Sequence, residues 1–185
     1  MRPRSSGVHV SERSLSPTKS GVALALKLPT ASTCFARTVN DSPWVVVDAN
    51  VIAKLFVEEE LTDNAGALFA GPTLTTAPDF IAVEVANIFR KKVRGGELTE
   101  AEALAALELL PSLARLQPVA PLTPTAFSIS VTHNRSFYDS VYVALALREA
   151  CSLISADRKL INALRSHYPG TLVWLGDLPS SDGSR

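Results

Sequence analysis

The sequence predicts an α/β protein with a central parallel sheet and helices on both faces. Short apolar runs rich in β-branched residues alternate with longer stretches of helical periodicity. The first run, Val45-Val46-Val47, is continuously apolar, as expected of a strand that is buried on both faces. Because parallel strands need a crossover between them, this alternation favours a parallel sheet over an antiparallel one.

The predicted elements follow one another from Trp44 onward. Strands are expected at 44–48, 74–76, 115–119, 153–155 and 171–175, and helices at 50–60, 63–70, 79–94, 99–110, from 123–124 onward, 138–149 and 157–166. Thr99 and Glu102 have the spacing of a capping box at a helix start. Pro111 should stop that helix, whereas Pro124 suits the first position of the next one.

The periodic pattern defines one domain, which we expect to span residues 44–178. Residues 1–43 show little periodicity, and we expect them to be a disordered extension that a wrongly assigned start would explain. Their high Arg and Ser content is similar to that of an organellar transit peptide. The apolar island at 22–28 matches the pattern of a signal peptide poorly. Residues 179–185 are expected to form a flexible tail.

Composition limits the classes of partner and site. The net charge of zero divides into +4 for residues 1–43 and −4 for residues 44–185, so the domain's overall field would not attract nucleic acid. No run of eighteen apolar residues occurs, so we expect no membrane span. Two cysteines, Cys34 and Cys151, indicate a reducing compartment, and we expect a cytoplasmic protein. The three scattered histidines make a zinc site improbable.

Four acidic residues lie in apolar surroundings, where an uncompensated carboxylate is costly. They are Asp48, Glu84, Asp139 and Asp157. Asp48 and Asp157 follow predicted strands, Glu84 lies within a helix after another strand, and Asp139 begins a helix. In an open parallel sheet, such positions converge at the carboxyl edge. A shared divalent metal would compensate the four charges, since hard cations bind oxygen ligands and nucleases use such clusters.

Simpler roles exist for each feature. Asp48, Asp139 and Asp157 could be helix N-caps, a role that Asp commonly takes. The basic strip Arg90–Arg94 could complement a helix dipole or bind a polyanion locally. A phosphatase of the haloacid dehalogenase type also places an Asp after a strand, but it needs a second acid two residues on, where this chain has Asn50.

Four segments resemble, in order, the motifs of PIN-domain ribonucleases. They are Val45–Ile52, Ala77–Asn87, Tyr138–Ala146 and Leu153–Leu160. The resemblance covers about residues 44–178, and the short length points to the VapC toxins of bacterial VapBC toxin–antitoxin pairs. Two features depart from the family pattern: Ser155 stands where a Thr is usual, and the extension has no counterpart.

The resemblance implies a PIN-like three-layer fold and RNA cleavage that depends on Mg²⁺, with Mn²⁺ as a substitute. Asp48, Glu84, Asp139 and Asp157 would be the catalytic residues and metal ligands, direct or through water. Asn50 and Ser155 would make secondary polar contacts.

The resemblance also implies a homodimer and a VapB-like antitoxin. The antitoxin helix would lie in a groove beside the acids, lined by Val51, Leu55, Phe56, Ile81, Val85 and Phe89, although periodicity alone assigns most of these to the core. Two other functions remain open at this point: a PIN nuclease in RNA processing without an antitoxin, and a non-catalytic module that binds a partner. Magnesium-dependent stabilisation would argue against the module, and a neighbouring antitoxin gene against the stand-alone nuclease.

Overall fold

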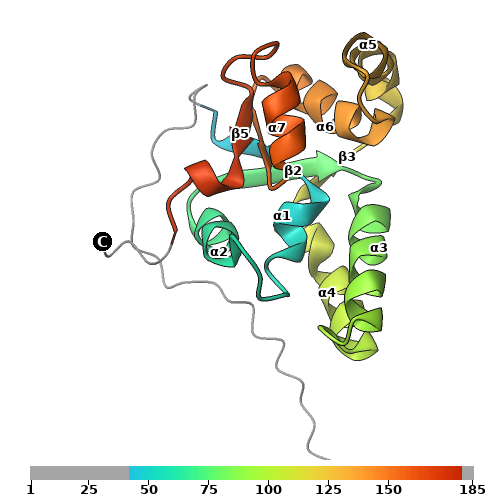
Figure 1. The fold of residues 1–185 in the computed structure, drawn as a ribbon, viewed down its shortest axis with the longest axis vertical. Coiled ribbons are helices and arrows are strands. Elements are labelled where there is room, and N and C mark those ends of the chain that lie inside the picture. Colours follow the sequence, from blue (N-terminus) through green and yellow to red (C-terminus); the bar gives the residue numbers. More distant parts are fainter. Residues whose placement is uncertain (1–41, 181–185) are drawn as a thin grey trace, which may run out of the picture.

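The computed structural model describes residues 42–180, whose elements are shown in Figure 1. The strands are β1 (Trp44–Val47), β2 (Leu74–Pro78), β3 (Arg115–Gln117), β4 (Ser152–Ser155) and β5 (Leu172–Trp174). The helices are α1 (Ala49–Ala53), α2 (Thr62–Ala70), α3 (Ile81–Arg94), α4 (Glu100–Leu113), α5 (Thr123–His133), α6 (Phe137–Arg148) and α7 (Arg158–Leu164), with short 3₁₀ turns at Ala120–Leu122 and Leu175–Asp177. The predicted alternation of strands and helices is confirmed.

All the strand pairs are parallel, in the order β3-β2-β1-β4-β5. The central strand β1 pairs with β2 on one side and with β4 on the other, so that Val46 lies opposite Thr76 and Leu153. The chain adds β2 and β3 on one side of β1 and then returns to add β4 and β5 on the other. In such sheets, ligands bind outside the carboxyl ends of the strands where the order reverses, which here is between β1 and β4.

The helices cover both faces of the sheet, as predicted. In Figure 1, α1 to α4 lie below the sheet and α5 to α7 lie above it. Right-handed crossovers account for this division, because connections that run in opposite directions along the sheet place their helices on opposite faces. The result is the expected three-layer α/β fold.

The core is centred on β1 and α6. Val45, Val46 and Val47 are fully buried, which fits a central strand covered by helices on both faces. Every residue of α6 from Ser140 to Ala146 is buried, and this helix packs on β1, β2 and β4. A helix buried around its whole circumference fixes the position of its first turn, where Asp139 lies.

The predicted helix at 50–60 is wrong beyond its first turn, because α1 ends at Ala53. The next turn tightens, with the amides of Leu55 and Phe56 bonding to carbonyls three residues back. Leu55 and Val57 are both buried, and two residues that lie two apart cannot face the same side of a helix. Because both Leu55 and Val57 are buried, the backbone cannot continue as an α-helix through these residues.

Two other predicted boundaries also differ. Pro111 does not stop α4, which runs to Leu113. The buried residues Leu110 and Ala114 hold both sides of this turn, and the amide of Ala114 bonds to the carbonyl of Leu110 at 3.2 Å. β3 ends at Gln117 and not at residue 119, and a 3₁₀ turn follows it.

The antitoxin groove expected beside the acids is not formed by the residues named for it. All of these side chains except Phe56 are buried in the core, and Phe56 packs edge-to-face on Phe89 with ring centroids 5.6 Å apart. The predictions for the apolar island at 22–28 and for Cys34 lie outside the described residues. Within residues 42–180, no helix is long and apolar enough to cross a membrane.

A candidate carboxylate site at the carboxyl edge of the sheet

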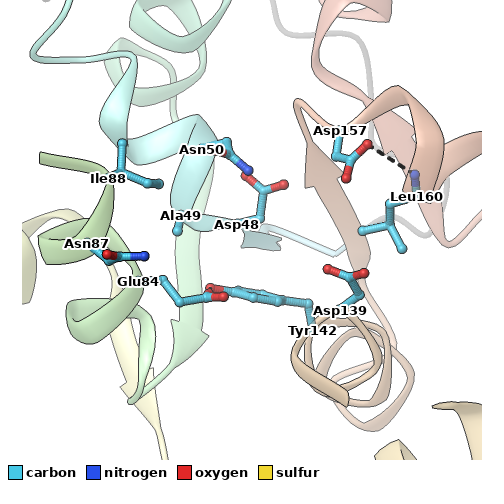
Figure 2. Close-up of a pocket in the computed structure, with 10 residues that line it drawn as sticks. All are labelled: Asp48, Ala49, Asn50, Glu84, Asn87, Ile88, Asp139, Tyr142, Asp157 and Leu160. Atoms are coloured by element: carbon cyan, nitrogen blue, oxygen red, sulfur yellow. Dashed lines mark hydrogen bonds between the residues drawn. The ribbon is translucent and has the colours of Figure 1, made fainter. Parts of the chain in front are cut away.

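The four predicted acids line a single cavity of about 190 Å³ at the carboxyl edge of the sheet. Figure 2 shows their carboxylates around a common space between α3 and α7. The lining residues are Asp48, Ala49, Asn50, Glu84, Asn87, Ile88, Asp139, Tyr142, Asp157 and Leu160. Acids up to 109 positions apart in the chain, Asp48 and Asp157, therefore meet at the point where the strand order reverses.

Asp48 follows β1 directly and is almost completely buried. Its Oδ1 accepts the amide of Val51 at 2.8 Å and so caps α1. Its Oδ2 accepts a short hydrogen bond from the hydroxyl of Ser155 at the end of β4. The capping role is therefore real, but a carboxylate has about four acceptor sites, so acceptor capacity remains for a ligand in the cavity.

Asp157 and Ser155 form the neighbouring corner. Oδ1 of Asp157 accepts the amides of Lys159 at 2.8 Å and Leu160 at 3.2 Å, and so caps α7. The hydroxyl of Ser155 also accepts the amide of Asp157 at 3.0 Å. Ser155 is fully buried and does not line the cavity, so its hydroxyl orients the carboxylate of Asp48 and the backbone of Asp157 from below.

Glu84 reaches the cavity from the first turn of α3, on the opposite side from Asp157 (Figure 2). Its Oε2 accepts a 2.5 Å hydrogen bond from the phenol of Tyr142 on α6. Phe80 packs edge-to-face on the ring of Tyr142, with centroids 5.4 Å apart. Glu84 is half-buried and hydrogen-bonded by a neighbouring helix, which contrasts with a solvated surface glutamate.

Asp139 lies in the first turn of α6 but does not cap it. The cap is Ser136, whose Oγ accepts the amide of Asp139 at 3.0 Å. The simpler interpretation of Asp139 as an N-cap is therefore wrong. Its carboxylate remains available to the cavity, which it lines.

The acids perturb one another electrostatically. Burial raises the pKa of Asp48 to about 6, against the hydrogen bonds from Ser155 and Val51, and the charge of Asp157 adds to the rise. Burial also raises the pKa of Glu84; the hydroxyl of Tyr142 opposes this rise, and the charges of Asp48 and Asp139 add to it. The cavity therefore disfavours its own negative charge, and a bound cation would relieve that cost.

The donor set suits a hard cation. The cavity offers carboxylate and amide oxygens and contains no histidine or cysteine. Across residues 42–180, no group of three or more acidic, histidine or cysteine side chains is close enough to hold an ion directly. The arrangement fits an ion held by one or two carboxylates with water reaching the others, which is the coordination that Mg²⁺ prefers.

Tyr142 and Asn87 belong to the site but were not predicted as site residues. Tyr142 lies three positions after Asp139, and Asn87 lies three positions after Glu84. Residues three apart on a helix share a face, so this spacing was a signal that could have identified both. Asn50, for which secondary polar contacts were predicted, lines the cavity.

Solved structures share this fold at low sequence identity. A Pyrobaculum aerophilum protein, PAE2754, aligns with a TM-score of 0.55 at 20% identity, covering 72% of this chain and 84% of that one. Mycobacterium tuberculosis VapC20, described as a Sarcin-Ricin loop cleaving toxin, aligns with a TM-score of 0.52 at 20% identity over 64% of this chain and 94% of that one. A toxin–antitoxin complex from Klebsiella pneumoniae aligns with a TM-score of 0.50 at 20% identity, covering 70% and 95%.

Sequence comparison identifies the family. Ribonuclease VapC3 of Pyrobaculum aerophilum is 36% identical over 119 residues, which cover 63% of this chain and 91% of that protein. Ribonuclease VapC1 of Mycobacterium tuberculosis is 33% identical over 93 residues, or 49% of this chain and 68% of that protein. The family model for the PIN domain matches residues 45–164, which contain all four acids. This chain therefore belongs to the PIN-domain family, among the VapC ribonucleases.

Proposed function

We propose that this protein is the toxin of a VapBC-type toxin–antitoxin pair and cleaves RNA as a metal-dependent endoribonuclease. The observation that carries the proposal is the convergence of four carboxylates from four separate elements on one cavity, in a chain of the PIN family. Relatives named ribonucleases, 36% and 33% identical to this chain, support the proposal.

Each carboxylate has a distinct part in the proposed site. Asp48 and Asp157 are fixed by their caps and by Ser155, so they would hold Mg²⁺ or Mn²⁺ with little reorganisation. Glu84 and Asp139 face them across the cavity and would hold the metal's water shell. A bound Mg²⁺ lowers the pKa of a coordinated water and screens the charge of the phosphate.

The overall reaction is the hydrolysis of a phosphodiester. Water forms a new bond to phosphorus, and the bond from phosphorus to the 3′-oxygen breaks, which leaves a 5′-phosphate and a 3′-hydroxyl. The acids repel a bare phosphate, so cations that reduce the negative charge of the cavity should strengthen RNA binding. Cleavage itself should require the metal for its chemistry.

An antitoxin and a homodimer are the proposed partners, and the cytoplasm is the proposed location. Exposed apolar side chains support a protein interface: Phe127 and Val131 lie one turn apart on α5 with 62% and 66% of their surface exposed. Val83 on the outer face of α3 is 71% exposed. Size-exclusion chromatography with light scattering, with and without the product of an adjacent small gene, tests both partners.

Cleavage of an end-labelled RNA tests the enzymatic proposal. The wild type should cut in Mg²⁺ or Mn²⁺ and stop in excess EDTA. Asp48→Asn should not cut, whereas Asp63→Asn should cut as the wild type does, because Asp63 is an exposed acid on α2 outside the cavity. Cleavage by Asp48→Asn, or by the wild type without metal, would refute the proposal.

A further inference from the structure

A second hollow of about 140 Å³ lies beside the acidic cavity, between α7 and the turn that follows β5. It is lined by Arg158, Ile161, Asn162, Arg165, Trp174 and Asp177. The same helix lends Asp157 and Leu160 to the acidic cavity. Successive residues of a helix turn by about 100°, so these two sets form adjoining stripes along α7. An RNA chain that leaves the acidic cavity over the first turn of α7 would therefore enter this hollow.

Positive charge dominates this hollow, although the domain as a whole is acidic. Arg158 and Arg165 supply two positive charges, and Asp177 supplies one negative charge. Asp177 forms a salt bridge with Arg165 at 2.6 Å. Within residues 42–180, Arg158 forms no salt bridge. Residues 44–185 carry 12 basic and 16 acidic side chains, so a polyanion must find a local site of this kind.

The guanidinium of Arg158 is held in place. Its central carbon lies 3.5 Å from the ring centre of Trp174, a cation–π stack that leaves the N–H edges of the fork free. Trp174 in turn lies against Gly176, where an added Cβ would be only 2.2 Å from the indole ring. The indole Nε1 is buried and has no hydrogen-bond partner within the described chain, so packing and not hydrogen bonding positions the ring. Because its side chain is already held in place, Arg158 would lose less conformational entropy when it binds a ligand.

We propose that this hollow is a substrate subsite, in which Arg158 and Arg165 bind a backbone phosphate of the RNA next to the nucleotides in the acidic cavity. Planar guanidinium forks match the oxygens of a phosphate and bind them through two hydrogen bonds. Asn162 lies between the two arginines on the same stripe and offers a donor and an acceptor to the adjoining sugar. The inference rests on the proposed function, because it assigns a place to the RNA that the acidic cavity cleaves.

Binding of an uncleaved RNA oligonucleotide to the Asp48→Asn protein tests the subsite directly. Adding Arg158→Ala or Arg165→Ala should weaken binding by about tenfold, as expected for loss of a charge-assisted contact. The slope of log affinity against log salt concentration should also fall by about 0.7 for each phosphate contact that is lost.

Arg115→Ala is the matched control. Arg115 also stacks on a tryptophan, with its central carbon 4.0 Å from the ring centre of Trp44. That stack lies at the amino ends of β1 and β3, on the opposite edge of the sheet from the acids. Removing Arg115 deletes the same charge and the same kind of stack, so it should change neither RNA affinity nor the salt slope.

The two tryptophans supply a second measurement. In a Trp44→Phe background, the emission of Trp174 should change when RNA is added, because the ligand engages the arginine that covers its ring. In a Trp174→Phe background, the emission of Trp44 should not change.

The outcomes separate this inference from the proposed function. If the wild type fails to cleave any RNA with Mg²⁺, the function itself is wrong. If the wild type cleaves RNA while the Arg158 and Arg165 variants bind and cleave like the Arg115 variant, the subsite is wrong. Support requires a raised KM with little change in kcat, since the contact is made equally in ground and transition states. Arg158→Lys, which keeps the charge but not the fork, should lie between wild type and Arg158→Ala.

Discussion

Replacing Asp48 with Asn should stabilise the metal-free protein while abolishing cleavage. The folded environment raises the pKa of Asp48 from 3.8 to about 6, mainly because the side chain is buried. Keeping this carboxylate charged therefore costs the fold about 3 kcal/mol, at about 1.36 kcal/mol for each pKa unit. Asn keeps an oxygen for the amide of Val51, and the hydroxyl of Ser155 can rotate to accept its NH₂.

The pH dependence has a definite sign. Below pH 3.8 Asp48 is protonated in both the folded and the unfolded state, so its contribution to stability is zero. Between pH 3.8 and about 6 the folded state holds the proton more tightly, so stability falls as pH rises. Above about 6 the full cost is present. The Asp48→Asn variant lacks this fall.

Urea unfolding in EDTA measures the effect. At about pH 7.5 the variant should exceed the wild type by about 3 kcal/mol, or by about 6–12 °C in melting temperature for a protein of this size. Magnesium should narrow this difference by stabilising the wild type alone, by about 1.4 kcal/mol at ten times the dissociation constant. A variant no more stable than the wild type in EDTA would refute the argument that the charge of Asp48 is costly.

Three further predictions address other parts of the chain. Tyr142→Phe removes the hydrogen bond that lowers the pKa of Glu84, so the acidic limb of the pH–rate profile should move to higher pH and kcat should fall about tenfold. Gly176→Ala forces a Cβ into the ring of Trp174 and should destabilise the fold by about 1–3 kcal/mol, as measured by urea unfolding. Removing residues 1–43 should leave the RNA cleavage rate unchanged; an insoluble or inactive product would show that the extension is needed.

The sequence by itself predicted the elements that depend on local pattern. The alternation of short strand-like runs with helical periodicity identified all five strands and the seven helices of the described residues, because side-chain direction repeats with a fixed period in each. Two of the boundaries that failed, at Ala53 and around Pro111, are places where burial of neighbouring side chains overrides local preference. Near Ala53, local propensity amounts to less than about 1 kcal/mol per residue, which is smaller than the burial of one leucine. At Pro111, the larger cost of a helical proline, about 3 kcal/mol, is opposed by the burial of Leu110 and Ala114.

The four acids could also be found from the sequence, because a carboxylate inside an apolar run is costly and therefore conspicuous. Only the tertiary structure decided how they are used. Asp48 and Asp157 cap helices with one oxygen and face the cavity as well, Ser155 lies beneath them, and Tyr142 binds Glu84 across 58 positions of sequence. The hollow beside α7 joins residues of a helix to a strand and a turn. Sequence pattern determines which face of an element is apolar, but the contacts between elements depend on packing, which joins residues without any periodic relation.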